Sequence, residues 1–166
     1  MARSATVRGR AKQAEATQGS PEADPISYGL LEHWVGFHLR MAQAASFQAF
    51  AREVEDVDLR PGRFATLALI GCNPGISQTA LSRANGRDKS TLTPVLDDLV
   101  RRGLVRRVRT PADRRTYQLT LTLSGEKVLQ RLTESARRHE DRLDRLLGAK
   151  DRQVFLQILR RIETEM

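Results

Sequence analysis

Apolar residues recur every three or four positions from Ser27 to Val54, which is the period of an amphipathic α-helix. They cover more than one stripe of the expected helix. Because a helix that is apolar on two sides often packs on its own domain and on a partner, residues 27–58 are expected to form a first dimerisation helix. Its apolar positions are Leu30, Leu31, Trp34, Val35, Met41, Ala42 and Ala45, with Phe37, Phe47 and Phe50 beside them.

Three shorter helices are expected next. Pro61 opens the first, since proline is favoured at the start of a helix. Ser77 and Asp88 cap the second and third, because their side-chain oxygens can accept from the free N–H groups of a first helical turn. Residues 85–87 join the last two into a helix-turn-helix, and Gly103 ends the third. The apolar face of that third helix consists of Leu92, Val95, Leu96 and Leu99.

The apolar period changes from helical to alternating after Gly103. Leu104–Arg109 and Thr116–Thr122 are expected to be strands, and the polar residues 110–115 between them form a turn. A two-stranded ribbon behind a helix-turn-helix is a winged helix, which is placed at residues 59–123.

Helical spacing returns after Thr122, which can cap a long helix. Gly148 is expected to end that helix and a last helix to follow it, so that residues 124–166 supply C-terminal dimerisation helices. The expected fold class is mainly α with a small β-ribbon, a winged helix-turn-helix between long N- and C-terminal dimerisation helices. Residues 1–26 are polar and basic and are expected to be a disordered tail.

The distribution of charge along the chain indicates a function. The 166 residues carry a net charge of +8, and only four of the 28 cations are lysines. A genome with an arginine bias would explain the total. It would not explain why residues 101–115 hold seven arginines and a single acid. Clustered cations release condensed counterions from DNA, so the ribbon is expected to bind phosphate.

The helix after Asp88 presents the second part of this interface. At 100° per residue, Ser90, Pro94 and Asp97 point away from the apolar face. The first turn offers Lys89 and short hydroxyl side chains at a helix N-terminus, where phosphate is favoured. Serine and threonine also simply cap and solvate structural helices. The basic ribbon beside them favours the DNA interpretation.

In order and spacing, several motifs of the chain resemble the MarR (multiple-antibiotic-resistance regulator) family of winged-helix transcription factors. The resemblance runs from Leu59 to about Leu129, and its most specific part is Asp88-Lys89-Ser90-Thr91-Leu92-Thr93-Pro94. Further along it includes Gly103-Leu104-Val105, Asp113-Arg114-Arg115 and Leu119-Thr120-Leu121-Thr122.

The resemblance implies a homodimer whose first and last helices intertwine, bound as a repressor to palindromic double-stranded operator DNA. The helix after Asp88 would enter the major groove, and Asp113 would orient Arg115 toward the minor groove. A winged-helix module that binds RNA or another protein is the alternative. The expected DNA-binding residues are Lys89, Ser90, Thr91, Thr93, Pro94, Arg101, Arg109, Asp113, Arg114 and Arg115.

Several further residues affect the expected function. Asp97 and Asp98 place negative charge on the DNA-facing helix. Asp97 is expected to disfavour approach to the DNA backbone unless it pairs with Arg101 or accepts from a cytosine amine. Pro94 is expected to kink the helix at a cost of roughly 3 kcal/mol. Cys72 lies outside residues 27–54, where the family's hydroperoxide sensors carry their cysteine, and is expected to be a buried or loop thiol.

The resemblance also implies a small effector, such as a phenol, an aromatic acid or an aromatic thioester, that releases the DNA. Its cleft would lie between the first, second and fifth helices, with Trp34, His38, Met41 and Phe64 as candidate lining residues. Arg40 or His33 would meet a carboxylate. The same residues at helical spacing are also typical of an ordinary core.

Other functions find little support in the sequence. Three histidines and one cysteine form no motif that places a base beside a nucleophile, so no enzyme activity and no cofactor are expected. His33 and His38 lie about 140° apart on a helix, so no metal site is expected. The chain has no run of 18 apolar residues, so a cytoplasmic protein without membrane contact is expected.

Overall fold

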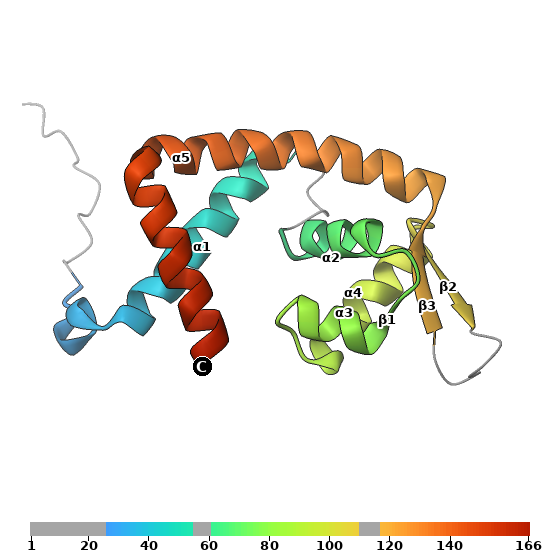
Figure 1. The fold of residues 1–166 in the computed structure, drawn as a ribbon, viewed down its shortest axis with the longest axis horizontal. Coiled ribbons are helices and arrows are strands. Elements are labelled where there is room, and N and C mark those ends of the chain that lie inside the picture. The colour runs from blue at the N-terminus through green and yellow to red at the C-terminus, as the bar shows by residue number, and fades with distance from the viewer. Residues whose placement is uncertain (1–25, 55–60, 110–116) are drawn as a thin grey trace, which may run out of the picture.

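The computed structural model describes residues 26–54, 61–109 and 117–166. Two groups of elements are visible in Figure 1, a winged helix at one end and a pair of long helices at the other. The elements are the 3₁₀ helix η1 (Gly29–His33), α1 (Val35–Glu53), α2 (Pro61–Cys72), β1 (Ile76–Ser77), α3 (Gln78–Ala84), α4 (Lys89–Arg101), β2 (Val105–Arg109), β3 (Tyr117–Leu121) and α5 (Leu123–Glu165).

The first helix differs from its prediction. The α-helix begins at Val35 rather than Ser27, because Trp34 is extended (φ −94°, ψ 117°) and separates η1 from α1. Gly29 adopts a positive φ of 53°. His38 Nε2 donates to the Glu32 carbonyl oxygen at 2.8 Å, which pairs a carbonyl near the break. The predicted end at Val54 is confirmed within one residue.

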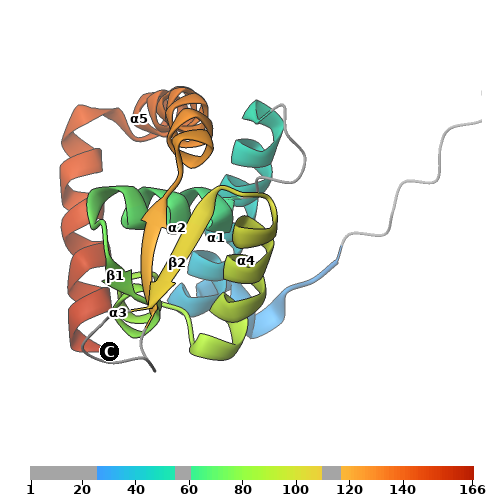
Figure 2. The same cartoon turned by 90° about the vertical axis from the view of Figure 1, so that its right-hand side faces the viewer.

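The winged helix follows the sequence pattern closely. Ser77 Oγ accepts from the Ala80 N–H at 3.1 Å, so the predicted cap of α3 is confirmed. Strands β2 and β3 pair antiparallel with Arg107 opposite Leu119, as the predicted ribbon requires. No pattern in the sequence predicts β1, which pairs with the other edge of β3, so that β3 lies between β1 and β2 (Figure 2). A strand of two residues is too short to show an alternating pattern.

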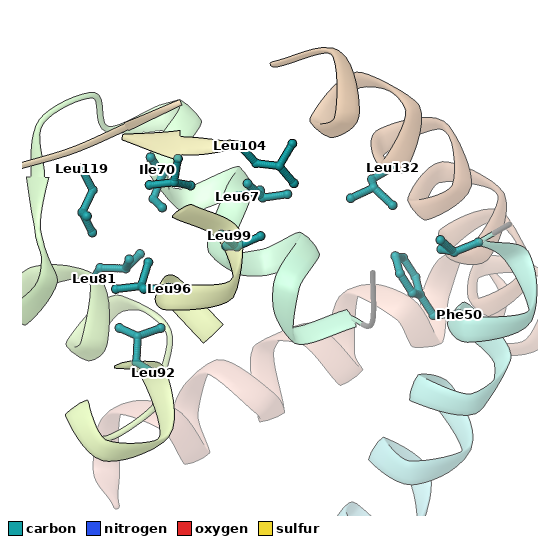
Figure 3. Packing of buried hydrophobic residues seen from close by; sticks show 12 residues of the cluster. Phe50, Leu67, Ile70, Leu81, Leu92, Leu96, Leu99, Leu104, Leu119 and Leu132 are labelled. Carbon is teal, nitrogen blue, oxygen red and sulfur yellow. The ribbon is translucent and has the colours of Figure 1, made fainter. Parts of the chain in front are cut away.

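One hydrophobic core holds the winged helix together. Seven apolar side chains from α2, α3, α4 and β3 are fully buried, and Figure 3 shows them converging from these elements. Phe50 of α1 and Leu132 of α5 belong to the same cluster and connect it to the long helices. The fully buried set is Leu67, Ile70, Leu81, Leu92, Leu96, Leu99 and Leu119.

Helix α5 links the two ends of the molecule. It starts at the cap Thr122, whose hydroxyl oxygen accepts from the Gly125 N–H at 3.0 Å. It then runs past α2 to α1 and turns sharply (Figure 1). The turn is at Gly148, whose φ of 73° and ψ of 157° interrupt the helix, as predicted. An ion pair between Arg152 and Asp144 spans this bend.

Candidate nucleic-acid interface

The N-terminus of α4 is an exposed turn organised by its cap. Asp88 Oδ1 accepts from the Ser90 hydroxyl at 2.5 Å and from the Thr91 N–H at 2.8 Å, and Oδ2 accepts from the Thr91 hydroxyl at 3.1 Å. These bonds, the Ser90 hydroxyl first, lower the pKa of Asp88 to about 2. Because both hydroxyls donate inward, Ser90 and Thr91 present acceptor lone pairs outward, and the exposed Lys89 supplies the cation.

Thr93 and Pro94 lie on different sides of α4. Thr93 Oγ1 donates to the Lys89 carbonyl at 2.7 Å and accepts from Gln78 Nε2 at 2.9 Å, so this side chain ties α4 to the start of α3. Pro94 is exposed, and α4 continues through it to Arg101. The proline therefore does not end the helix.

At the Arg109–Tyr117 end of the β2–β3 ribbon, an arginine contacts an aromatic ring. The Arg109 guanidinium carbon lies 5.6 Å from the centre of the Tyr117 ring, and Nη2 donates to the tyrosine oxygen at 3.2 Å. Tyr117 was not among the predicted site residues. The predicted wing-tip residues Asp113, Arg114 and Arg115 lie outside the described residues.

Asp97 has a different partner from the predicted one. Its Oδ1 lies 2.7 Å from Arg107 Nη1. Arg101 instead pairs with Asp98, so the predicted Asp97–Arg101 pair is wrong. The physical reason is that β2 runs beside α4 and brings Arg107 to Asp97, while the less exposed Asp98 attracts Arg101. The charge of Asp97 on the outer face of α4 is thus compensated by the wing.

Asp98 is the centre of a cationic cluster. It is 7% exposed, and its Oδ2 lies 2.8 Å from Arg63 Nη2 and 3.1 Å from Arg102 Nε. Burial raises the pKa of this carboxyl, but the charges of Arg63 and Arg102 outweigh that effect and the pKa is below its usual value. The cluster is on the last turn of α4. Arg101, a predicted DNA contact, therefore lies roughly 18 Å along the helix axis from Lys89.

A cavity of about 390 Å³ opens between α1, α2 and α5. This is where the sequence placed the effector cleft, and its volume is in the range of small-molecule sites. Of the predicted lining residues, Phe64 is there. Trp34, His38, Arg40 and Met41 lie on exposed parts of α1 and the segment before it, outside this cavity. The lining residues are Ser46, Phe47, Phe50, Pro61, Phe64, Thr133, Ala136, Arg137, His139 and Glu140.

His139 is one of the lining residues that sequence reasoning missed. It is 6% exposed, its Nε2 and Ser46 Oγ are 3.0 Å apart in a hydrogen bond, and it meets the Phe50 ring edge-on. Its Nδ1 is buried and has no hydrogen-bond partner among the described residues. The signal available in the sequence was a histidine in the apolar stripe of α5.

Two further properties bear on the chemistry of the chain. Cys72 is an exposed free thiol at the last residue of α2, and the prediction of a buried or loop thiol is wrong. In residues 26–54, 61–109 and 117–166, no group of three His, Cys, Asp or Glu side chains is arranged to hold a metal ion. No helix of these same residues is long and apolar enough to cross a membrane.

Several known proteins that are similar to this chain are named transcriptional regulators or repressors. A protein of Thauera aromatica named "Putative transcriptional regulatory protein for hcr operon" is 34% identical over 138 residues, which is 82% of this chain and 83% of that protein. The transcriptional repressor CouR bound to a 23-mer DNA duplex superposes with a TM-score of 0.76 and 38% identity, over 84% of this chain and 99% of CouR.

CouR also has a structure bound to p-coumaroyl-CoA, with a TM-score of 0.78 and 36% identity over 86% of this chain and all of CouR. PcaV of Streptomyces coelicolor, in complex with its natural ligand, superposes with a TM-score of 0.77 and 29% identity over 84% of this chain and 98% of PcaV.

The fold and the exposed α4 beside a basic ribbon define a winged-helix transcriptional regulator. The model of the MarR family matches residues 59–117, and the chain belongs to the MarR family.

Proposed function

We propose that this protein is a homodimeric repressor that binds operator DNA through α4 and the β2–β3 wing. The observation that carries the proposal is the exposed first turn of α4 next to the arginine-rich β2, in a chain 38% identical to a repressor bound to a DNA duplex. In this assignment Lys89, Ser90, Thr91 and Pro94 enter the major groove. Arg109, Asp113, Arg114 and Arg115 act from the wing.

The apolar surface of the long helices supports the homodimer. Trp34 is 57% exposed and Leu146 is 75% exposed, although both are large apolar side chains. Exposed apolar residues gathered on one region are typical of an interface. We therefore assign Trp34, His38, Arg40 and Met41 to this surface rather than to the cavity of the single chain. Other exposed apolar residues of these helices and of the segment before them include Ile26, Tyr28, Leu30, Leu31, Val35, Phe47, Val154, Phe155 and Ile158.

The cavity supports an aromatic effector that releases the DNA. Phe47, Phe50 and Phe64 offer aromatic surface, while His139 and Ser46 offer hydrogen-bonding groups inside. Arg137, which is exposed and also lines the cavity, would meet an anionic group of the ligand. CouR binds p-coumaroyl-CoA, an aromatic thioester of the class that fits these groups.

DNA binding is tested by fluorescence anisotropy with the duplex that lies upstream of the protein's own gene. We expect sequence-specific binding that weakens steeply with salt, and a footprint with half-sites about 34–36 Å apart. Equal affinity for a scrambled duplex, or a preference for RNA, would contradict the proposal. Titration with p-coumaroyl-CoA and with simpler aromatic acids then tests release.

The wing assignment makes a specific prediction for Arg115. Arg115→Ala should lower the affinity for the duplex by at least 10-fold, on the order of 1–3 kcal/mol, because it removes a groove-inserted cation. Arg131→Ala is the matched control, since Arg131 is exposed on α5 away from the wing. Equal affinities of the two variants would remove the wing from the interface.

A further inference from the structure

The first two turns of α2 make contacts in two directions. On one side Pro61 and Phe64 line the α1–α2–α5 cavity, and the Phe64 ring lies 5.6 Å from that of Phe50. On the other side the same turns meet the helix-turn-helix. Figure 1 shows α2 lying between α5 and the α3–α4 pair. This short segment is therefore the wall of the cavity and also a support of the DNA-binding unit.

Two of the contacts on the helix-turn-helix side reach the turn between α3 and α4. The Arg87 guanidinium packs so closely on Gly62 that a Cβ at Gly62 would overlap it. Thr66 Oγ1 donates to the Gly62 carbonyl at 2.8 Å and accepts from Asn85 Nδ2 at 3.0 Å. Both contacts join α2 directly to this turn.

The third contact reaches α4 itself. Arg63 Nη2 lies 2.8 Å from Asp98 Oδ2, and this carboxylate is 7% exposed. Arg101 and Arg102, on and directly after α4, also pair with this carboxylate, and Arg63 is the partner that α2 supplies. Losing Arg63 would remove part of the charge compensation of a buried carboxylate, which is unfavourable. The Arg63–Asp98 pair therefore favours one position of α2 relative to α4.

We propose that Arg63 and Asp98 are positioning residues that couple occupancy of the cavity to the placement of α4. The proposal rests on the proposed function, in which the cavity takes an effector and α4 takes DNA. Arg63 and Phe64 are consecutive residues of one helical turn, so a ligand that displaces the Phe64 ring also displaces Arg63. Asp98 then either moves with it, carrying α4, or loses the contact. In both cases the DNA-bound placement of α4 is no longer favoured.

The test uses a substitution in place of a ligand, since the effector is unidentified. Ala136 lines the cavity and is partly buried, so Ala136→Phe fills part of it. This substitution is combined with Arg63→Met, which keeps an apolar stem and removes the charge, and with Arg63→Lys, which restores a charge. The full chain is titrated with the upstream duplex by fluorescence anisotropy, and circular dichroism confirms that each variant is folded.

We expect Ala136→Phe to weaken DNA binding by roughly 5- to 150-fold in the parent chain, the usual range of coupling between sites. The same substitution should change the affinity by less than about 2-fold in the Arg63→Met background, and part of its effect should return with Arg63→Lys. An equal effect in the parent and Arg63→Met backgrounds would overturn the proposal. An absent effect of Ala136→Phe in the folded parent chain would overturn it as well.

Hydrogen exchange separates this proposal from the proposed function. Ala136→Phe should speed amide exchange in α4 in the parent chain but not in the Arg63→Met background, whether or not the duplex binds. If Ala136→Phe leaves amide exchange in α4 of the parent chain unchanged, the proposed coupling is contradicted. A parent chain that binds no duplex while α4 exchange responds as expected would contradict the DNA assignment alone.

Discussion

At the scale of single residues, the charges on α4 are explained by the partners that the fold supplies. Asp97 and Arg107 join α4 to β2 at 2.7 Å. This pair fixes the orientation of α4 relative to the wing. The orientation matters because α4 and the wing are proposed to bind different grooves of the DNA. Arg107→Asp should weaken duplex binding, since it removes a cation and places two carboxylates together. The exchanged pair Asp97→Arg with Arg107→Asp should recover part of the affinity.

The measurement for this pair is duplex affinity at fixed salt for both single variants and the exchanged pair. A double variant that is weaker than the product of the single effects would show that the pair does not act as a unit. Arg106→Asp is the matched control, because Arg106 is exposed on the other face of β2. The duplex affinity that Arg106→Asp loses should not be recovered when Asp97→Arg is added.

Asp88 gives a prediction for the dependence of stability on pH. Its pKa is about 2 in the folded chain against an ordinary value of 3.8, so folding favours the charged form. The stabilisation is present above about pH 3.8 and is lost as the pH falls from there toward 2. Thermal unfolding between pH 5 and pH 2.5 should therefore show a smaller decline for Asp88→Asn, which still caps the helix. Parallel declines in the two proteins would contradict the prediction.

At the scale of elements, the position of α5 depends on one glycine. A Cβ at Gly125 would overlap the Leu104 carbonyl oxygen and lie 3.0 Å from its carbon, and backbone atoms cannot move aside like a side chain. Gly125→Ala should lower the free energy of unfolding by roughly 1–3 kcal/mol. Gly36→Ala in α1 meets no atom within 4 Å and should be neutral or slightly stabilising. Denaturant unfolding of the two variants checks the contrast.

Elements whose signals are local could be predicted from the sequence. The caps Ser77, Asp88 and Thr122 identify helix starts because their hydrogen bonds span three residues. The break at Trp34 could not be predicted, since apolar spacing continues across it and no polar cap marks the new start. The strand β1 exists because β3 offers a free edge, and that edge is more than forty residues away.

At the scale of the whole molecule, the two candidate sites differ in how far the sequence can define them. The proposed DNA-binding surface comes from one continuous segment, so charge and helical phase along the sequence are enough to predict α4 and the ribbon as its parts. The cavity is made where three distant helices meet, and Ser46 and His139 are 93 residues apart. Helical spacing predicts which face of α1 is buried. It does not predict which turn of α1 lies beside α2 and α5. The predicted cleft and the observed cavity involve the same three helices, and of the residues predicted to line the cleft Phe64 lines the cavity.

The proposed dimer is the assembly that would place two winged helices on a palindromic operator, and its surface is testable apart from the winged helix. Phe155 is 39% exposed and Ile158 is 41% exposed on α5 beyond Gly148, and neither belongs to the core cluster. Ile158→Asp should therefore convert the dimer to a monomer in analytical ultracentrifugation and leave the helical content unchanged. Gln157→Asp, at an exposed neighbouring position, is the control. Because two linked winged helices bind two half-sites with a gain in effective concentration, the monomer should bind the palindromic duplex at least 10²-fold more weakly but a single half-site equally well. A monomer that retains full affinity for the palindrome would show that dimerisation is not required for DNA binding.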